Sequence, residues 1–158
     1  MVQILAIFGA KYLFILPLVI FVIYVFKIPR FLQKRVLVLS AISSVLTFLA
    51  VFLLGILYYN PRPFMVLGFD PLVFHIPDNG FPSEHAVYTA LIASIVYSFN
   101  PKAGTFLFFV SIIISLSRVY AGVHHIVDII AGILLAIVMT YLAQIIIEKF
   151  FPSPQKQG

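Results

Sequence analysis

The sequence predicts an all-α membrane protein, a polytopic bundle of transmembrane helices. Hydrophobic residues make up 63% of the 158 positions and charged residues only 9%, whereas soluble domains carry about 25% charged residues. The apolar residues form continuous runs close to the roughly 20 residues that a helix needs to cross a bilayer. We therefore expect about five spanning helices in one domain, residues 1–158, with no room for a sizeable soluble domain.

The five apolar runs predict the spans in order. The first covers residues 4–26 and has almost no basic leader, so we interpret it as a retained span rather than a signal peptide. The second covers residues 36–59. The third, residues 84–99, is short, so we expect its first turn at the membrane interface or in a protein-lined cavity. The fourth and fifth cover residues 103–121 and 126–147.

The basic residues predict the orientation in the membrane. Seven of the ten follow the first, third and fifth runs, namely Lys27, Arg30, Lys34, Arg35, Lys102, Lys149 and Lys156. The positive-inside rule makes that side cytoplasmic. The N-terminus then lies outside and the C-terminus inside, and the loop of residues 60–82 between the second and third spans is extracytoplasmic.

The outward side receives most of the remaining ionisable residues: Arg62, Asp70, His75, Asp78, Glu84, His85, Arg118, His124, His125 and Asp128. Ionisable groups at membrane depth cost several kcal/mol unless they are paired or hydrated, so their clustering indicates a functional site. An ordinary hydrated loop explains Asp70, His75 and Asp78. The net charge of +5 is spread over so few charged residues that we expect no nucleic-acid partner, and the lack of cysteine excludes thiol chemistry.

One residue pair has the chemistry of a nucleophile and its orienting group. His124 and Asp128 are four residues apart, which places them on one face of a helix. Asp128 can then accept the proton of one imidazole nitrogen and leave the other nitrogen free to attack. A structural hydrogen bond in an apolar helix remains the alternative.

A second group of residues suits an anion. Ser83 precedes an apolar run and is expected as a helix N-cap, with Glu84 and His85 in the first turn. Helix N-termini bind phosphate, and Arg62 and Arg118 have guanidinium groups that can bind it in a bidentate manner. For either arginine alone, snorkelling toward lipid headgroups is an alternative. Together the residues indicate an anion site with a nucleophile and a proton donor.

The spacing of these residues resembles the three-part signature of the type 2 phosphatidic acid phosphatase superfamily. The matching residues are Arg62-Pro63, then Pro82-Ser83-x-His85, then Ser117-Arg118 followed after five residues by His124 and after three more by Asp128, within residues 55–132. The resemblance implies that His124 attacks phosphorus and forms a phosphohistidine, with Asp128 orienting it. It implies that His85 protonates the leaving oxygen and later activates water, while Arg62, Ser83 and Arg118 bind the phosphoryl oxygens. No metal or other cofactor is needed in that scheme.

The chain departs from the family pattern at three points. Gly55 stands where the first motif has lysine, and Lys11 could supply the missing charge or simply snorkel. Glu84 stands where the commonest motif has glycine and could tune the substrate. With the segment NPRPF, Glu84 resembles the bacterial undecaprenyl-diphosphatase branch, which recycles the polyprenyl carrier of cell-wall synthesis. Five expected spans, where the family usually has six, leave the oligomeric state open.

The leading hypothesis is a lipid phosphatase of the bacterial cytoplasmic membrane, acting on the extracytoplasmic side and converting undecaprenyl diphosphate into undecaprenyl phosphate. Its substrate would enter sideways from the bilayer. Phosphatidic acid, phosphatidylglycerol phosphate and a lipid A phosphate are the rival substrates. Two other classes remain: a metalloenzyme with His85, His124, His125 and Asp128 as ligands, and a small proton-coupled transporter. The transporter is less favoured because the polar residues crowd one end of the helices.

Overall fold

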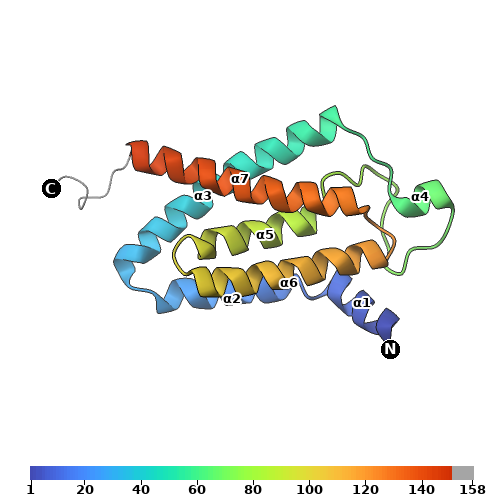
Figure 1. Ribbon diagram of the computed structural model, residues 1–158, viewed down its shortest axis with the longest axis horizontal. Helices are drawn as coiled ribbons and strands as arrows, with labels where there is room; N and C mark the ends of the chain where they lie inside the picture. The colour runs from blue at the N-terminus through green and yellow to red at the C-terminus, as the bar shows by residue number, and fades with distance from the viewer. Residues whose placement is uncertain (151–158) are drawn as a thin grey trace.

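The computed structural model describes residues 1–150, which form a bundle of helices (Figure 1). They are α1 (Val2–Lys11), α2 (Ile15–Lys27), α3 (Arg30–Leu57), α4 (Pro63–Leu67), α5 (Glu84–Tyr97), α6 (Pro101–Tyr120) and α7 (Ile126–Phe150). Within residues 1–150 there is no β-strand, and Pro61 and Asn79 form an isolated bridge. The predicted all-helical fold is confirmed.

The short helix α5 is the centre of the bundle. It packs against α2, α3, α6 and α7, and nine of its 14 residues are buried. Small residues at these contacts let the backbones approach closely, as is common between membrane helices. At Gly132 of α7, an added Cβ would lie 3.1 Å from the carbonyl oxygen of Ser83. The beginning of α5 and the first turns of α7 are therefore in close contact.

The first predicted span is wrong as a continuous helix. Residues 4–26 form two helices, α1 and α2, which are bent by 50° at a short break. Pro17 explains the break, because its ring would clash with the carbonyl of the residue four positions earlier and it has no N–H to donate. In the observed structure Pro17 lies in the first turn of α2, where that missing donor costs little.

The other predicted elements differ mainly at their ends. Helix α3 begins at Arg30 rather than near residue 36, directly after Pro29, and the five-residue helix α4 lies inside the predicted loop. Helix α6 begins at Pro101, where the side chain of Asn100 accepts a hydrogen bond from the backbone N–H of Ala103. Proline at the first helical position and asparagine before it are favoured helix-starting residues.

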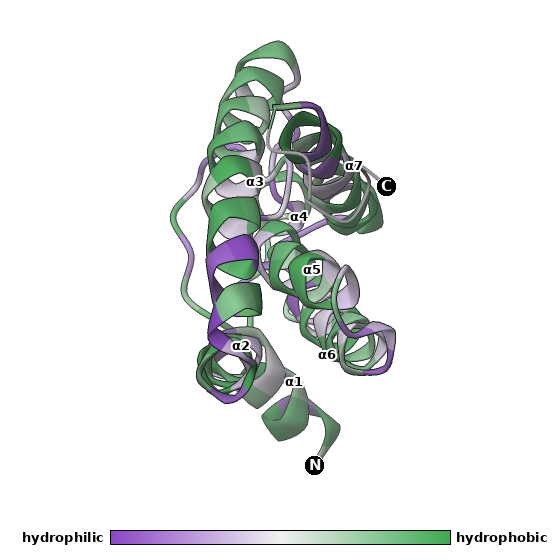
Figure 2. Ribbon diagram, turned by 90° about the vertical axis from the view of Figure 1, so that its left-hand side faces the viewer, coloured by the Kyte–Doolittle hydropathy of each residue, from purple (hydrophilic) through white to green (hydrophobic). Residues whose placement is uncertain are grey.

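Three helices, α3, α6 and α7, are long and apolar enough to cross a membrane, and the bent pair α1 and α2 could form a fourth span. Figure 2 shows hydrophobic residues over most of the length of these helices. Helix α5 has 14 residues, fewer than a helix needs to cross a bilayer. This agrees with the expectation that the third span is short. The protein is a multi-pass membrane protein, while the number of five spans and the single domain stay predictions.

The two ends of the bundle differ in character. The turn between α2 and α3, the turn between α5 and α6 and the end of α7 lie at one end, and α4 and the corner between α6 and α7 lie at the other (Figure 1). Six of the seven basic residues predicted on the cytoplasmic side lie at the first end, and the seventh, Lys156, lies outside the described residues. The loop of residues 60–82 lies at the second end, with the candidate site.

Candidate active site

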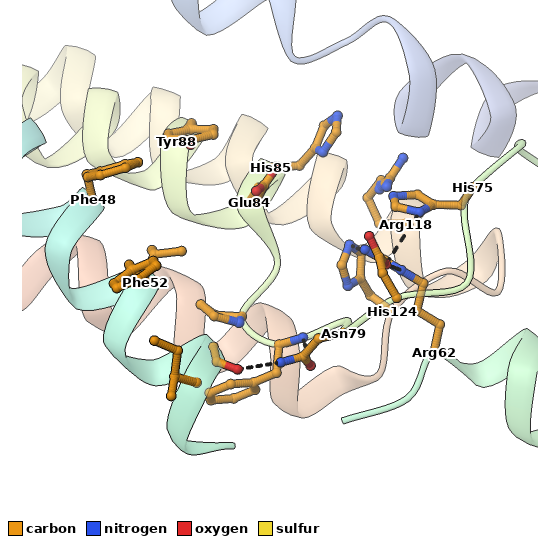
Figure 3. A pocket seen from close by; sticks show the side chains of 16 residues that line it. Phe48, Phe52, Arg62, His75, Asn79, Glu84, His85, Tyr88, Arg118 and His124 are labelled. Carbon is orange, nitrogen blue, oxygen red and sulfur yellow. Dashed lines mark hydrogen bonds and ion pairs between the residues drawn. The ribbon is translucent and has the colours of Figure 1, made fainter. Parts of the chain in front are cut away.

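A cavity of about 430 Å³ lies between α3, α5 and the loop of residues 60–82 (Figure 3). One part of its lining is polar: Arg62, His75, Asp78, Asn79, Glu84, His85, Arg118 and His124. The other part is apolar and comes mainly from α3: Phe48, Val51, Phe52 and Ile56, with Tyr88 from α5. The cavity therefore combines a charged end with a hydrophobic wall.

His124 is buried, with 3% of its surface exposed, and both ring nitrogens have close neighbours. Nδ1 lies 3.0 Å from the carbonyl oxygen of Gly80 and 3.5 Å from Oδ2 of Asp128, and Nε2 lies 3.2 Å from Nη1 of Arg62. Both oxygens beside Nδ1 accept, whereas arginine only donates. We therefore assign the proton of the neutral ring to Nδ1, so that Nε2 carries the lone pair needed for nucleophilic attack.

The prediction that His124 and Asp128 share a helix is wrong, although the two side chains do meet. Helix α7 begins at Ile126, so His124 precedes it. Oδ2 of Asp128 accepts a hydrogen bond of 2.7 Å from the backbone N–H of His125, as an acidic side chain in a first turn does when it caps its own helix. This capping contact begins the helix after His125 and still turns the carboxylate toward the imidazole of His124.

Asn60 and Asn79 are site residues that the sequence did not identify. Nδ2 of Asn60 donates a hydrogen bond of 2.7 Å to Oδ1 of Asp128. Oδ1 of Asn79 accepts from the backbone N–H of Asn60 and of Phe81, both at 3.0 Å. These contacts join segments about 20 and 70 residues apart, a pairing that spacing along one helix does not reveal. The feature of the sequence that could have identified Asn60 is its position directly before Pro61-Arg62-Pro63.

Close packing around Gly80 brings these segments together. A Cβ added there would lie 3.2 Å from the carbonyl oxygen of Asn60 and 3.3 Å from both Cγ of Arg62 and Oδ2 of Asp128. The backbone N–H of Gly80 donates to that same carbonyl of Asn60 at 2.9 Å. Because Gly80 has no side chain, its carbonyl reaches the ring of His124.

Both predicted phosphate-binding arginines are 5% exposed, so neither snorkels to the bilayer surface. Nε of Arg62 donates to Oδ1 of Asp78 at 2.6 Å, and its Nη1 donates to the carbonyl oxygen of Val123 at 2.8 Å. Nη1 of Arg118 lies 3.3 Å from the carbonyl oxygen of Ala10, and its buried Nε has no partner among the described residues. The unpartnered donor on Arg118 and the cavity that Arg118 lines suit an anionic ligand.

The remaining predicted site residues occupy three kinds of position. His85 and Glu84 line the cavity, and the ring of His85 packs edge-on against Phe14 with centroids 5.2 Å apart. Ser83 is the predicted N-cap of α5, but it lies behind the lining, fully buried, and its hydroxyl has no partner within residues 1–150. Lys11 is exposed, lies over the ring of Tyr12 and does not line the cavity.

The interpretation of His75 and Asp78 as ordinary loop residues is wrong, because both line the cavity. Asp70 is exposed, as that interpretation predicts. The ring centroids of His75 and His124 are 6.3 Å apart, and the ring planes are at 74°. The loop therefore contributes its own ionisable side chains to the site.

Burial governs the protonation of the two loop histidines. Burial lowers the pKa of His124, Arg62 and Arg118 lower it further, and the hydrogen bond to Asp128 opposes them without reversing the shift. Burial and Arg62 likewise lower the pKa of His75. Both rings are thus neutral near pH 7, which leaves the lone pair of His124 available.

The four ligands of the metalloenzyme hypothesis do not form one centre. Among the described residues, no group of three or more His, Asp or Glu side chains is placed to bind a metal ion. Nε2 of His125 lies 3.1 Å from the carbonyl oxygen of Pro61, in a contact separate from those of His124. The arrangement suits a histidine nucleophile beside arginine anion ligands.

Comparison with known proteins agrees with this chemistry. The chain is 30% identical to the undecaprenyl-diphosphatase BcrC of Bacillus subtilis strain 168 over 111 residues, 70% of this chain and 58% of that protein. It is 30% identical to the putative undecaprenyl-diphosphatase YbjG of Escherichia coli strain K12 over 146 residues, 90% of this chain and 72% of that protein. It is also 30% identical to the bacitracin transport permease protein BcrC of Bacillus licheniformis over 115 residues, 72% of this chain.

The chain spans 57% of the length of that permease protein, little more than half. Its fold is similar to the crystal structure of Aquifex aeolicus LpxE, with a TM-score of 0.67 and 25% sequence identity over 89% of this chain and 81% of that one. The family model of the PAP2 superfamily matches residues 33–152, which include the cavity and the whole histidine and arginine cluster. The chain therefore belongs to the PAP2 superfamily.

Proposed function

We propose that this protein removes the terminal phosphate of a lipid diphosphate, converting undecaprenyl diphosphate into undecaprenyl phosphate and inorganic phosphate. The observation that carries the proposal is Nε2 of His124, which faces Nη1 of Arg62 at 3.2 Å in a cavity with one charged end and one hydrophobic wall. Two relatives bear the name undecaprenyl-diphosphatase, which supports this substrate over the other lipid phosphates.

In the first step, Nε2 of His124 attacks the terminal phosphorus. The bond from phosphorus to the bridging oxygen breaks, undecaprenyl phosphate leaves, and His124 carries the phosphoryl group. Its Nδ1–H remains directed at the carbonyl of Gly80 and at Asp128, which stabilise the positive charge on the ring. Arg62 and Arg118 neutralise the charge on the phosphoryl oxygens, the main requirement of phosphoryl transfer.

In the second step, water attacks the phosphohistidine. His85, which lines the same cavity, protonates the leaving oxygen in the first step and accepts a proton from this water in the second. The bond between phosphorus and Nε2 breaks, and inorganic phosphate leaves. Ser83, between the lining residues Pro82 and Glu84 at the N-terminus of α5, adds a hydrogen bond to a phosphoryl oxygen, and Glu84 tunes the choice of substrate. Lys11, which does not line the cavity, has no role in this scheme.

The hydrophobic wall gives the lipid tail a path to the bilayer. Phe48 and Phe52 of α3 line the cavity and are also 65% and 59% exposed on the surface of the bundle. Figure 3 shows both rings, with Tyr88, on the side of the cavity away from Arg62 and His124. The tail of the substrate can thus remain in lipid while its headgroup reaches the arginines.

The proposed location is the bacterial cytoplasmic membrane, with the site on the extracytoplasmic side, the N-terminus outside and the C-terminus in the cytoplasm. The separation of the basic turns from the site end of the bundle supports this orientation (Figure 1). Cysteine accessibility at Asp70 and Lys102, in a chain that has no natural cysteine, tests it. Labelling of Lys102→Cys but not Asp70→Cys by an impermeant reagent in intact cells would reverse the orientation.

The substrate proposal is tested with purified protein and four lipids: undecaprenyl diphosphate, phosphatidic acid, phosphatidylglycerol phosphate and a lipid A phosphate. We expect the fastest phosphate release from undecaprenyl diphosphate and none from any lipid with His124→Ala. Asp70→Asn, an exposed change in the same loop, is the control and should match the wild type. No release from undecaprenyl diphosphate, with release from another lipid, would reject this substrate.

The mechanism is tested by rapid acid-free quenching with substrate labelled at the terminal phosphate. We expect label on the wild-type chain that is stable to alkali and lost in acid, as a phosphohistidine is, and no label on His124→Ala. Full activity after chelator treatment is also expected. Label on another residue, or loss of activity to the chelator with recovery on metal addition, would reject the scheme.

A further inference from the structure

His75 belongs to the phosphate site, although it is outside the motif residues that identify the family. Its side chain is 22% exposed and lines the cavity that also contains Arg62, Arg118 and His124. The centroid of its ring is 6.3 Å from that of His124 and the ring planes are at 74°, within the range of edge-to-face ring pairs. Figure 3 shows His75 on the loop side of the cavity, next to Arg118.

The contacts of His75 fix one ring nitrogen and leave the other free. Nδ1 lies 3.3 Å from the carbonyl oxygen of Ile76 and 3.9 Å from Oδ1 of Asp78. The same oxygen of Asp78 accepts the 2.6 Å hydrogen bond from Nε of Arg62. Within residues 1–150, Nε2 of His75 makes no hydrogen bond. Asp78 thus couples the position of His75 to that of an arginine in the site and leaves Nε2 available to a ligand.

An anion in the cavity would change the charge of His75. Burial and the nearby guanidinium groups of Arg62 and Arg118 lower the pKa of His75, and Asp78 opposes them. Glu84, His85 and His124 are the other ionisable groups that line this cavity. A bound polyphosphate neutralises the arginines and favours the imidazolium form, which donates from Nε2. His75 can therefore become a cationic ligand when phosphate is present.

We propose that His75 binds the second phosphate of a diphosphate substrate, the phosphate attached to the lipid, while Arg62 and Arg118 bind the terminal phosphate at His124. This inference rests on the proposed phosphatase function and extends it to substrate choice. A monophosphate bound at Nε2 of His124 is contacted by the arginines. A diphosphate extends one phosphate further and reaches the additional donor on the loop.

A position on the opposite wall offers a way to replace this donor. Gly55 of α3 lines the same cavity, and a Cβ added there would have a single neighbour within 4 Å, the carbonyl oxygen of Phe81 at 3.9 Å. Position 55 therefore has room for the first atoms of a lysine side chain at the wall of the cavity. A lysine there would restore a positive charge to a site that has lost His75, without restoring any structural contact of the imidazole.

The test measures competitive inhibition by inorganic pyrophosphate and by inorganic orthophosphate, with phosphate release from undecaprenyl diphosphate or another accepted lipid phosphate as the assay. The variants are His75→Ala, His75→Gln, Gly55→Lys and His75→Ala with Gly55→Lys, and Asp70→Asn is the loop control. A hydrogen bond to a charged group corresponds to about 10- to 100-fold in affinity. We expect His75→Ala to raise the inhibition constant of pyrophosphate by this factor and that of orthophosphate by less than about twofold.

Each result decides the proposal. Recovery of pyrophosphate inhibition in the double variant supports a ligand role where it exceeds the gain that Gly55→Lys gives in the wild-type background, because a lysine at position 55 strengthens anion binding whether or not His75 is a ligand. Unchanged pyrophosphate inhibition in both single variants, or equal weakening for the two anions, overturns it. His75→Gln, which keeps a polar side chain of similar size, separates misfolding from ligand loss through its melting temperature. Phosphate release that depends on His124 tests the phosphatase function and does not depend on the result for His75. The proposed function and the proposed role of His75 can therefore be rejected independently.

Discussion

Nδ2 of Asn60 lies 2.7 Å from Oδ1 of Asp128, and this hydrogen bond joins the end of α3 to the first turn of α7. The other carboxylate oxygen accepts from the backbone N–H of His125 and faces Nδ1 of His124. With both oxygens engaged, the fully buried carboxylate cannot rotate away from the imidazole. We therefore infer that Asn60 is a positioning residue that acts through Asp128 on His124, the proposed nucleophile.

Replacing Asn60 with alanine should lower kcat by about 10- to 100-fold, because one lost hydrogen bond to a charged group costs about 1.5 to 3 kcal/mol. KM should change little, since Asn60 is not among the residues that line the cavity. Steady-state kinetics in detergent measure both quantities. Asn100→Ala is the matched control: it removes the cap of α6 at the other end of the bundle, so it should lower the melting temperature and leave kcat unchanged. An Asn60→Ala enzyme that loses only stability contradicts the positioning role.

Ser83→Ala should reduce phosphate affinity without a stability loss. The hydroxyl of Ser83 is fully buried and has no partner among residues 1–150, so its removal frees the fold from an unsatisfied polar group. Loss of one hydrogen bond to an anionic ligand should weaken orthophosphate inhibition by about tenfold. Ser115 on α6 is equally buried and unpartnered, but the residues beside it do not line the cavity, whereas Pro82 and Glu84 on either side of Ser83 do. Ser115→Ala should therefore bind phosphate as the wild type does. Equal behaviour of the two variants would remove Ser83 from the site.

The lowered pKa of His124 predicts the pH dependence. Only the neutral ring attacks phosphorus, so the form of His124 competent for attack should persist below the ordinary histidine value of 6.5. Histidine NMR across the pH range, assigned with His124→Gln, should place its pKa below that value. A pKa at or above 6.5 in the folded protein contradicts the burial argument.

The same shift predicts the pH dependence of stability. Between the folded pKa of His124 and the unfolded value near 6.5, the unfolded chain binds more protons than the folded chain. The free energy of unfolding should therefore fall as the pH decreases from about 6.5 through the folded pKa. Melting temperatures of the wild type and His124→Gln across this range measure the effect, and the variant should show the shallower decline. A steeper decline in the variant would contradict the predicted direction in which His124 makes the free energy of unfolding depend on pH.

Gly132→Val should disrupt the site indirectly, by disturbing the packing between α7 and the beginning of α5. A Cβ at this position already meets the carbonyl oxygen of Ser83 at 3.1 Å and Cγ2 of Val87 at 3.1 Å. The added branches would push the beginning of α5 from α7, where the backbone N–H of Ser83 donates to the carbonyl of Asp128 at 3.1 Å. Overpacking costs about 1 to 3 kcal/mol, and activity should fall by more than tenfold. Ile133→Val, on the same helix, is the control and should retain activity.

The helices and site residues that could be predicted from the sequence are those defined by patterns among residues close together in the chain. Apolar runs located α3, α6 and α7, because a helix that crosses a bilayer must satisfy its own backbone and cover it with apolar side chains. Motif spacing identified Arg62, His85, Arg118 and His124, which the structure brings into one cavity. The break between α1 and α2 was missed even though Pro17 was visible, because hydropathy alone does not report where backbone hydrogen bonds end.

The sequence by itself determined that the protein is helical and lies in a membrane, and it predicted that the charged residues form an anion site of the phosphatase type. Only the tertiary structure decided how that site is completed. Asn60 reaches Asp128 across 68 positions, and His75 enters the cavity from a loop that composition describes as merely polar. Such contacts depend on how helices pack and where loops close, and no periodicity along the chain specifies them.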